Sequence, residues 1–507
     1  MNATTPPRLS RTAAAMTVVA MGLGYTAAIV DPTILSAEMS TVRIGLGMST
    51  SAASFTASLA TLTMAAAVLG AGALGDVYGM RRMYVAGLLG TIAFGVAGAA
   101  APTTAVLMAA RAGLGVALAF LLGLSLAIVN AVFAPGRRTT VIAWYFGVGF
   151  AVSAPLPAIG GLLATHMSWR ACLLVTPAVA ATTLALTLRY VPHTPRTHRA
   201  LDLPGLALAA VALLALVFGI ARLETAVDVV AVTALGAAAL AAAGFITRES
   251  KALQPALDLS IFRSGRFNAA VTAGVVFNFL TGGLLILFAF YLVTVRGESP
   301  EVLGLLLIPA TVLAAVAATT AGPAAVRFGD RPVLVGGLTV MLVAVLLLRL
   351  FNENTSLAVV FAAVALMAVG GAVVATPQAS IMMAAAPAHL GGAVSGVKSA
   401  VNQTGYSLGP TVFALVGINL ILSAGADRLA GSGITLDEAR EAFRAAHGGP
   451  AGGSHMLDPD RAQTVATAAT ESMLDAIHTL SLVMATVPVA AIVVALIWLK
   501  PAPRHKV

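Results

Sequence analysis

The sequence predicts an all-α integral membrane protein with 14 transmembrane helices. Of the 507 residues, 59% are hydrophobic and only 10% are charged, and the mean hydropathy is +0.95. A water-soluble domain needs far more charge to cover its surface. Apolar runs of about 20 residues, the length of a helix that crosses the hydrocarbon layer, recur along the whole chain.

These apolar runs place each span to within a few residues. The spans lie at 12–35, 50–74, 83–101, 104–132, 139–164, 170–190, 203–221, 228–247, 267–291, 301–323, 331–350, 356–378, 393–421 and 478–499. An even number of spans puts both termini on the same side of the membrane. The first run is too long for the apolar core of a secretory signal, so we expect an uncleaved first helix.

Positive charge indicates which side of the membrane holds the termini. Nineteen of the 29 Lys and Arg residues, Lys398 among them, fall in loops and tails on the side of the termini. Because Lys and Arg are enriched in cytoplasmic loops, we expect a multi-pass plasma-membrane protein with cytoplasmic termini. The formal charge of +9 then reflects these loops, and nothing in the sequence suggests a nucleic-acid partner.

Two polar segments interrupt the series of spans. Residues 191–202 contain Pro and basic side chains, which indicates a cytoplasmic linker. Residues 422–477 form an extracellular loop, in which Thr435 and Glu438 have the spacing of a capping box at the start of a short helix. We expect this loop to be a solvated cover without chemistry of its own.

The first span carries a carboxylate deep within it. Asp31 follows an uncharged stretch from Thr12 to Val30. A charge at such a depth is costly and usually faces a bundle interior or a water-filled path. Pro32 removes a backbone donor beside it, which predicts a helix that is bent or opened there. Asp31 is therefore a candidate proton-handling residue of a transporter.

Arg111 places a second charge inside the membrane, in the fourth span. Its guanidinium stays protonated, so it needs a partner, water or a path to the interface. In one interpretation, Arg111 extends to the nearby outer surface. In the other it lies beside Asp31, and making and breaking that pair loads and releases a proton.

The loop between the second and third spans has a distinctive spacing. Its residues include Gly72, Asp76, Gly79, Arg81 and Arg82, where Gly79 permits a tight turn and the arginines suit an anionic membrane surface. This spacing resembles the signature loop G-x-L-x-D-x-x-G-x-R-R of the major facilitator superfamily. The resemblance implies that Asp76 and Arg81 help to latch two helix bundles in the outward-facing state.

A second copy of this loop lies between the tenth and eleventh spans. It keeps the spacing of Gly322, Arg327, Gly329 and Arg331, but Val326 stands where the acid would be. We expect this copy to latch more weakly or not at all. Two copies of one loop also support an internal repeat, which is common in transporter folds.

Other segments are similar to the 14-span drug:proton antiporter branch of this superfamily, and the resemblance covers residues 12–500. Asp31-Pro32-Thr33 looks like the D-x-T motif of that branch, and Arg111 with Gly115 matches an R-x-x-x-G core. Pro157, Gly160 and Gly161 match the P-x-x-G-G tail of the antiporter motif, with Leu156 where Gly is usual. The resemblance implies that this motif bends the fifth helix.

The resemblance also implies a division of the chain into two six-helix halves with two helices inserted between them. We expect an N-terminal half at 1–190, the linker at 191–202 and the inserted helices at 203–250. The C-terminal half then occupies 251–507 and includes the extracellular loop 422–477.

Several polar and aromatic side chains could line a central cavity, although such residues also make ordinary interhelical hydrogen bonds: Tyr25, Asn278, Tyr291, Asn402, Gln403 and Tyr406. The sequence has no phosphate-binding loop of the G-x-x-x-x-G-K-[ST] type, so ATP is not expected to drive the protein directly. It has no Cys/His cluster with metal-ligand spacing and a single Cys172. We therefore expect no cofactor and no metal.

The expected function is proton-coupled export of small amphipathic or cationic compounds, such as drugs and antibiotics, by alternating access. The partners are then the substrate, protons and the bilayer, and the protein acts as a monomer without enzymatic activity. Two alternatives remain: export of an endogenous lipid or secondary metabolite, and a non-transporting membrane scaffold or enzyme. The second alternative requires polar catalytic groups at one membrane face, and the sequence shows none.

Overall fold

The structure, a computed structural model, describes residues 9–194, 200–223, 228–252, 254–299, 301–387, 389–429 and 459–499. Within these ranges the chain forms helices and turns, and no strand is present. Fourteen helical stretches of the described chain are long and apolar enough to cross a membrane. The predicted all-α class with 14 spans is confirmed.

The helices follow the predicted spans closely. In the first part of the chain they are α1 (Arg11–Leu46), α2 (Thr50–Tyr78), α3 (Met80–Ala99), α4 (Thr104–Val132), α5 (Pro135–Ser153), α6 (Leu156–His166), α7 (Trp169–Cys172), α8 (Val175–Tyr190), α9 (Leu203–Leu223) and α10 (Val229–Glu249). In the second part they are the short 3₁₀ helix η1 (Leu259–Arg263), α11 (Gly265–Phe290), the π-helical turn η2 (Tyr291–Val295), α12 (Glu301–Phe328), α13 (Asp330–Leu347), the 3₁₀ turn η3 (Leu348–Leu350), α14 (Leu357–Ala384), α15 (Gly391–Leu429) and α17 (Pro459–Trp498).

Local chemistry sets several helix ends. The hydroxyls of Ser10 and Ser49 accept hydrogen bonds from the backbone amides of Ala13 and Ala52, which caps the N-termini of α1 and α2. Gly79 separates α2 from α3 with a φ of 98°, and Gly329 separates α12 from α13 with a φ of 89°. Because side chains disfavour this backbone conformation, glycine is needed in both copies of the loop.

Three helices depart from the expected spans. α1 continues through Pro32 to Leu46, so Pro32 does not open the helix. α15 and α17 extend to Leu429 and back to Pro459, so both ends of the expected loop 422–477 are helical. The expected capping box at Thr435 and Glu438 lies outside the described residues.

The fifth span is interrupted where proline is concentrated. α5 ends at Ser153, and α6 begins at Leu156 after Pro155, with Pro157 in its first turn. A proline lacks the amide that would continue the helical ladder, and it also restricts the residue before it. The interruption therefore coincides with two prolines that weaken the helical ladder at this point.

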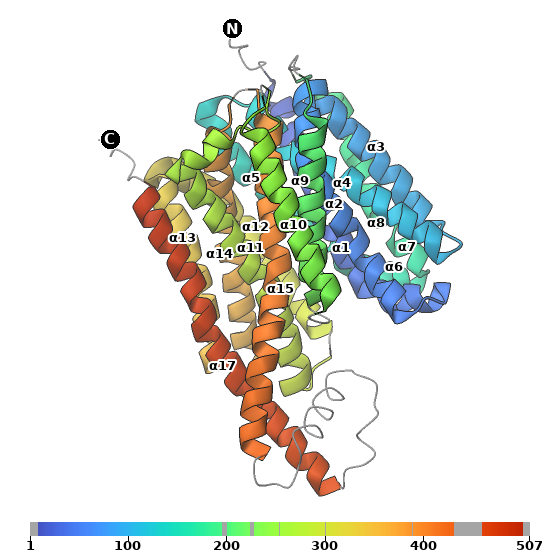
Figure 1. Ribbon diagram of the computed structural model, residues 1–507, viewed down its shortest axis with the longest axis vertical. Coiled ribbons are helices and arrows are strands. Elements are labelled where there is room, and N and C mark those ends of the chain that lie inside the picture. Colours follow the sequence, from blue (N-terminus) through green and yellow to red (C-terminus); the bar gives the residue numbers. More distant parts are fainter. Residues whose placement is uncertain are drawn as a thin grey trace.

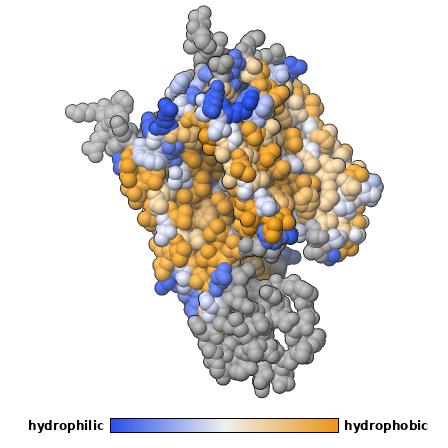
Figure 2. Space-filling model, viewed as in Figure 1, coloured by the Kyte–Doolittle hydropathy of each residue, from blue (hydrophilic) through white to orange (hydrophobic). Residues whose placement is uncertain are grey.

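The helices form two groups with a pair between them. Helices α1–α8 pack largely among themselves and form the N-terminal group, and α11–α17 form the C-terminal group. Figure 1 shows α9 and α10 between the two groups, with the start of α1 and the end of α17 at the same end of the molecule. We call this end the terminal end and the opposite one the far end. Figure 2 shows a broad hydrophobic belt between the more polar ends, which is the surface that a bilayer covers.

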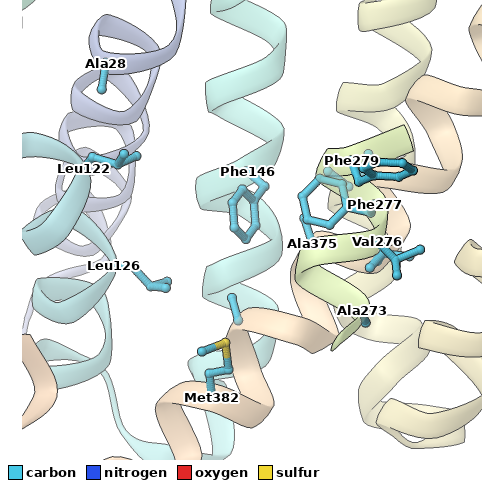
Figure 3. Close-up of a cluster of buried hydrophobic side chains, with 14 of the residues drawn as sticks. Ala28, Leu122, Leu126, Phe146, Ala273, Val276, Phe277, Phe279, Ala375 and Met382 are labelled. Carbon is cyan, nitrogen blue, oxygen red and sulfur yellow. The ribbon is translucent and has the colours of Figure 1, made fainter. Parts of the chain in front are cut away.

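The two groups meet mainly through α2 with α15 and through α5 with α12, and α4 with α15 and α5 with α14 add to the contact. The apolar core crosses this boundary: in Figure 3, Phe146 of α5 lies between Leu122 and Leu126 on one side and Phe277 and Ala375 on the other. Small residues permit the close approach. A β-carbon at Gly322 of α12 would lie only 2.5 Å from the Ala143 β-carbon of α5.

Candidate functional site

Two charged side chains meet inside the N-terminal group. Nη1 of Arg111, on α4, lies 2.7 Å from Oδ2 of Asp31, on α1, and the two side chains are 2% and 6% exposed. Thr176, on α8, donates its hydroxyl to Oδ1 of Asp31 at 3.2 Å. The pair therefore joins three helices, and Arg111 does not extend to the outer surface in this structure.

The surroundings of the pair are apolar, and its hydrogen bonding is incomplete. Val30, Ile34, Leu107 and Trp169 belong to a buried cluster around it. Nε and Nη2 of Arg111 have no hydrogen-bond partner within the part of the chain that the structure describes. Removing one partner of a buried ion pair typically costs about 3–5 kcal/mol, because the other charge is left uncompensated. Loss of the charge on Asp31 would therefore leave Arg111 buried without its counter-charge.

The glycines of the fifth-span motif pack against the same part of α1. A β-carbon at Gly160 would lie 2.9 Å from Cγ2 of Ile34, and one at Gly161 would lie 3.5 Å from Oε1 of Glu38. Pro157 stands at the start of α6, just after the helix interruption. The motif thus joins the kinked far part of the fifth span to the helix that carries Asp31.

Asp76, at the end of α2, joins the two groups at the terminal end. Its Oδ1 accepts a hydrogen bond from the backbone amide of Gly392 at 2.8 Å, and its Oδ2 accepts one from Ala393 at 2.9 Å. These amides are in the first turn of α15, where the helix dipole and unsatisfied N–H groups favour an anion. Asp76 of one group therefore caps a helix of the other.

Glycines allow α2 and α15 to come close enough for this cap. A β-carbon at Gly72 would lie 2.2 Å from the carbonyl oxygen of Gly392, and one at Gly392 would lie 2.3 Å from the carbonyl oxygen of Gly72. Either addition would push the two helices apart, so the sequence needs glycine on both sides of this contact.

Arg81 does not take the position that the latch hypothesis gave it. Its Nη2 donates to the carbonyl of Leu188 at 3.0 Å and its Nη1 lies 3.0 Å from Nε2 of His193. Both partners are at or just after the C-terminal end of α8, in the same group, where a cation suits the helix dipole. Arg81 therefore fixes the loop to its own group, and Arg82 is exposed beside it.

The second copy of the loop retains the packing and lacks the cap. Gly322 lies against α5 much as Gly72 lies against α15. Val326, in place of the acid, is 61% exposed and points away from this contact. Asp330, nearby, lies 3.8 Å from Arg266, which belongs to the same group.

The candidate cavity residues separate into two sets. Tyr25, Asn278, Asn402 and Gln403 are partly exposed, and Tyr406 is 39% exposed although it lies within a span. Tyr291 is buried at the far end, where its hydroxyl donates to the carbonyl of Asn352 at 2.7 Å. Tyr291 was therefore wrongly grouped with the others, because its polar atom is used in holding the end of α11 to the α13–α14 connection.

The described residues contain no group of three or more His, Cys, Asp or Glu side chains that could hold a metal ion. Cys172, the single cysteine of the chain, is buried on α7.

The comparison with protein families identifies the chain. Residues 12–410 match the family model described as Major Facilitator Superfamily. The chain belongs to this superfamily.

Curated relatives within the superfamily are drug-resistance proteins. The chain is 30% identical over 410 residues to the multidrug resistance protein Stp of Mycobacterium tuberculosis, which covers 79% of this chain and 75% of the relative. It is 30% identical to the multidrug efflux pump LfrA of Mycolicibacterium smegmatis, over 69% of this chain and 70% of that one. It is 28% identical to the tetracenomycin C resistance and export protein of Streptomyces glaucescens, over 79% and 75% of the two chains.

Solved structures of the superfamily share the fold. The proton:xylose symporter XylE, with 6-bromo-6-deoxy-D-glucose bound, superposes with a TM-score of 0.60 at 12% identity, over 97% of this chain and 96% of that chain. The human organic anion transporter MFSD10 gives a TM-score of 0.59 at 16% identity, over 96% and 98% of the two chains. Membership of the superfamily, together with the 14 spans of the described residues, makes the chain a multi-pass membrane transporter.

One charged residue of this superfamily member was misplaced by the sequence analysis. Lys398 was counted with the cytoplasmic loops, but it lies inside α15 and is 4% exposed. Its position only seven residues after the start of the helix resembles that of a lysine that extends to the membrane surface. The direction of its side chain depends on which face of α15 packs against the N-terminal group, and the residues around Lys398 in the sequence do not indicate that face.

Proposed function

We propose that this protein exports small amphipathic compounds, including drugs or antibiotics, from the cytoplasm in exchange for protons. The buried Asp31–Arg111 pair is the observation that carries the proposal. Drug-resistance relatives that match most of the chain support the substrate class and the direction. In this proposal the protein is a plasma-membrane transporter with cytoplasmic termini and no enzymatic role, as the excess of Lys and Arg at the terminal end supports.

The two groups of helices act as the moving halves. They correspond to 1–190 and 251–507, joined by the linker 191–202, and the inserted helices at 203–250 lie between them. The contacts of α2 with α15 and the cap by Asp76 join the groups at the terminal end, and in this proposal they hold that end closed in the state that opens toward the far side. Alternating access then consists of breaking these contacts and closing the far end.

Asp31 couples the proton to this movement. The carboxylate is near the far part of α1, so a proton reaches it from outside when the far side is open. Protonation removes the charge that faces Arg111 and leaves a buried guanidinium whose Nε and Nη2 lack partners in the described chain. The cost of that uncompensated charge changes the packing of α1, α4 and α8. Because Ile34 of α1 lies against Gly160, the change in packing also extends to α6.

The proposal is tested with Asp31→Asn in proteoliposomes that carry a pH gradient. Asparagine keeps the shape and removes the titrating group, so uphill transport should be lost while downhill exchange of substrate continues. Glu353→Gln is a matched control, because it removes an exposed acid at the far end. A variant at Asp31 that still concentrates substrate at the wild-type rate would exclude this residue from coupling.

A further inference from the structure

Lys398 is a buried cation that the proposed mechanism does not use. It lies on α15 within the span Gly391–Gly425 and is 4% exposed. An ionisable side chain inside a span normally faces the bundle interior and has a partner, and it marks a substrate or ion path. The question is which group acts as its partner.

The described chain supplies no acid for Lys398. None of the ion pairs among the described residues involves it, and no carboxylate lies within 4.0 Å of its ammonium. The buried acid of the first span, Asp31, already faces Arg111, and that pair is neutral as a whole. Asp76, the buried acid between the two groups, caps the first turn of α15, so Lys398 has no ion-pair partner among the described residues.

Aromatic rings of the N-terminal group surround the ammonium instead. Nζ lies 5.0 Å from the ring centroid of Phe146, on α5, and 6.0 Å from that of Tyr25, on α1. These two rings meet at 5.5 Å, and Tyr25 also contacts Tyr145 and Phe150 with centroids at 5.4 Å and 6.3 Å. Tyr25 is only partly buried, whereas Phe146 is 1% exposed, so a ligand would meet this aromatic group at Tyr25.

Polar groups continue along the same face of α15. Asn402 is one helical turn beyond Lys398, which places the two side chains on one face. The Oδ1 of Asn402 accepts a hydrogen bond from Nε2 of Gln378 at 2.9 Å. Oε1 of Gln378 is buried without a partner in the described chain, so this polar group retains an unused acceptor.

We infer that Lys398 and the rings of Tyr25 and Phe146 form a substrate site that selects aromatic acids over aromatic cations. The inference rests on the proposed function and specifies its substrate class. A carboxylate or phenolate supplies the counter-charge that the chain does not, and a planar ring system stacks on the aromatic group. A cationic drug of the same shape meets an ammonium in a medium of low dielectric constant, where like charges repel strongly.

The test compares two xanthene dyes that share a ring system and differ in charge. Carboxyfluorescein is the anionic probe and rhodamine 123 the cationic one. Initial rates of transport are measured in proteoliposomes under one fixed pH gradient for the wild type, Lys398→Met, Lys398→Arg and the control Lys251→Met, an exposed lysine at the terminal end. Thermal unfolding of each purified variant reports whether it folds.

The wild type should transport the anion at least about tenfold faster than the cation, given the strength of charge interactions away from water. Lys398→Met should remove that preference, while Lys398→Arg and Lys251→Met retain it. If Lys398→Met fails to fold, the preference of the wild type and of Lys398→Arg still decides the question. A wild type that prefers the cation, or a ratio that Lys398→Met leaves unchanged, overturns the inference.

The outcome also separates this inference from the proposed function. Uphill transport of rhodamine 123 alone would support the exporter and exclude the acid-selective site. Failure to move either dye, together with no proton flux on their addition, would overturn both.

Discussion

The cap that Asp76 places on α15 gives a direct test of how the terminal end stays closed. Asp76→Asn removes the negative charge and keeps one acceptor oxygen. The side chain now accepts from only one of the two amides, at Gly392 and Ala393, and its NH₂ group faces the other. A hydrogen bond to a charged group contributes about 1.5–3 kcal/mol, and the interaction with the helix dipole is also lost.

These losses act on one state only, because the cap exists only when the terminal end is closed. We expect Asp76→Asn to weaken the closed state by about 2–3 kcal/mol relative to the open one. At about 1.4 kcal/mol per factor of ten, the ratio of closed to open molecules falls roughly 30- to 150-fold. Substrate binding should persist, and turnover should slow because the state open to the far side is seldom reached.

Electron–electron resonance distances between spin labels measure this shift. Labels at Gly136 and Val326 lie at the terminal ends of α5 and α12, one in each group. Both positions have room for a label, because a β-carbon at Gly136 meets nothing within 4 Å and Val326 is 61% exposed. The variant should gain a longer distance that the wild type lacks. Asp330→Asn is the matched control, since that acid faces Arg266 of its own group at 3.8 Å. A distance distribution equal to that of the wild type would refute the cap as the element that holds this end.

Two further predictions concern charge pairs elsewhere. Arg111→Gln should lower the free energy of unfolding by about 3–5 kcal/mol, because Asp31 is left buried without its counter-charge. Adding Asp31→Asn should restore much of that free energy. Thermal unfolding in detergent of the two single variants and the double variant measures these changes, and equal losses in all three variants would contradict the prediction. Asp202, before α9, bonds to Arg248 at 2.8 Å, and this partner lowers the pKa of its carboxyl. The stabilisation is therefore complete above the ordinary carboxyl pKa of about 3.9 and is lost as pH falls through the lowered value, so Asp202→Asn should remove part of the acid sensitivity of unfolding.

The spans could be predicted because the bilayer imposes them. Length and hydropathy decide which segments cross, and they placed even α9 and α10 within a few residues. Helix continuity was harder to predict. Pro32 lies inside an unbroken helix, whereas Pro155 ends one, and the difference depends on packing that composition does not report.

The partners of some charged residues could be predicted and those of others could not, because these partners also depend on how the helices pack. The cost of burying Asp31 and Arg111 made each conspicuous, and a contact between them followed as one of two alternatives. Arg81 gave no such signal, because its partners are carbonyls at the end of α8 more than 100 residues away. Lys398 was missed because a lysine near a helix start has the same local pattern whether it points to water or to a neighbouring helix.

The inserted pair α9 and α10 makes the two sides of the molecule unequal. α9 touches both groups: Val217 packs with Leu62 and Ala65 of α2, and the hydroxyl of Thr411 on α15 donates to the carbonyl of Ile220 at 3.3 Å. α9 thereby packs on both helices of the α2–α15 contact, and no described helix outside the two groups packs on both α5 and α12 in the same way. The boundary between the two groups is therefore covered by an extra helix on the α2–α15 side, and a movement of the groups there must also move or slide past α9.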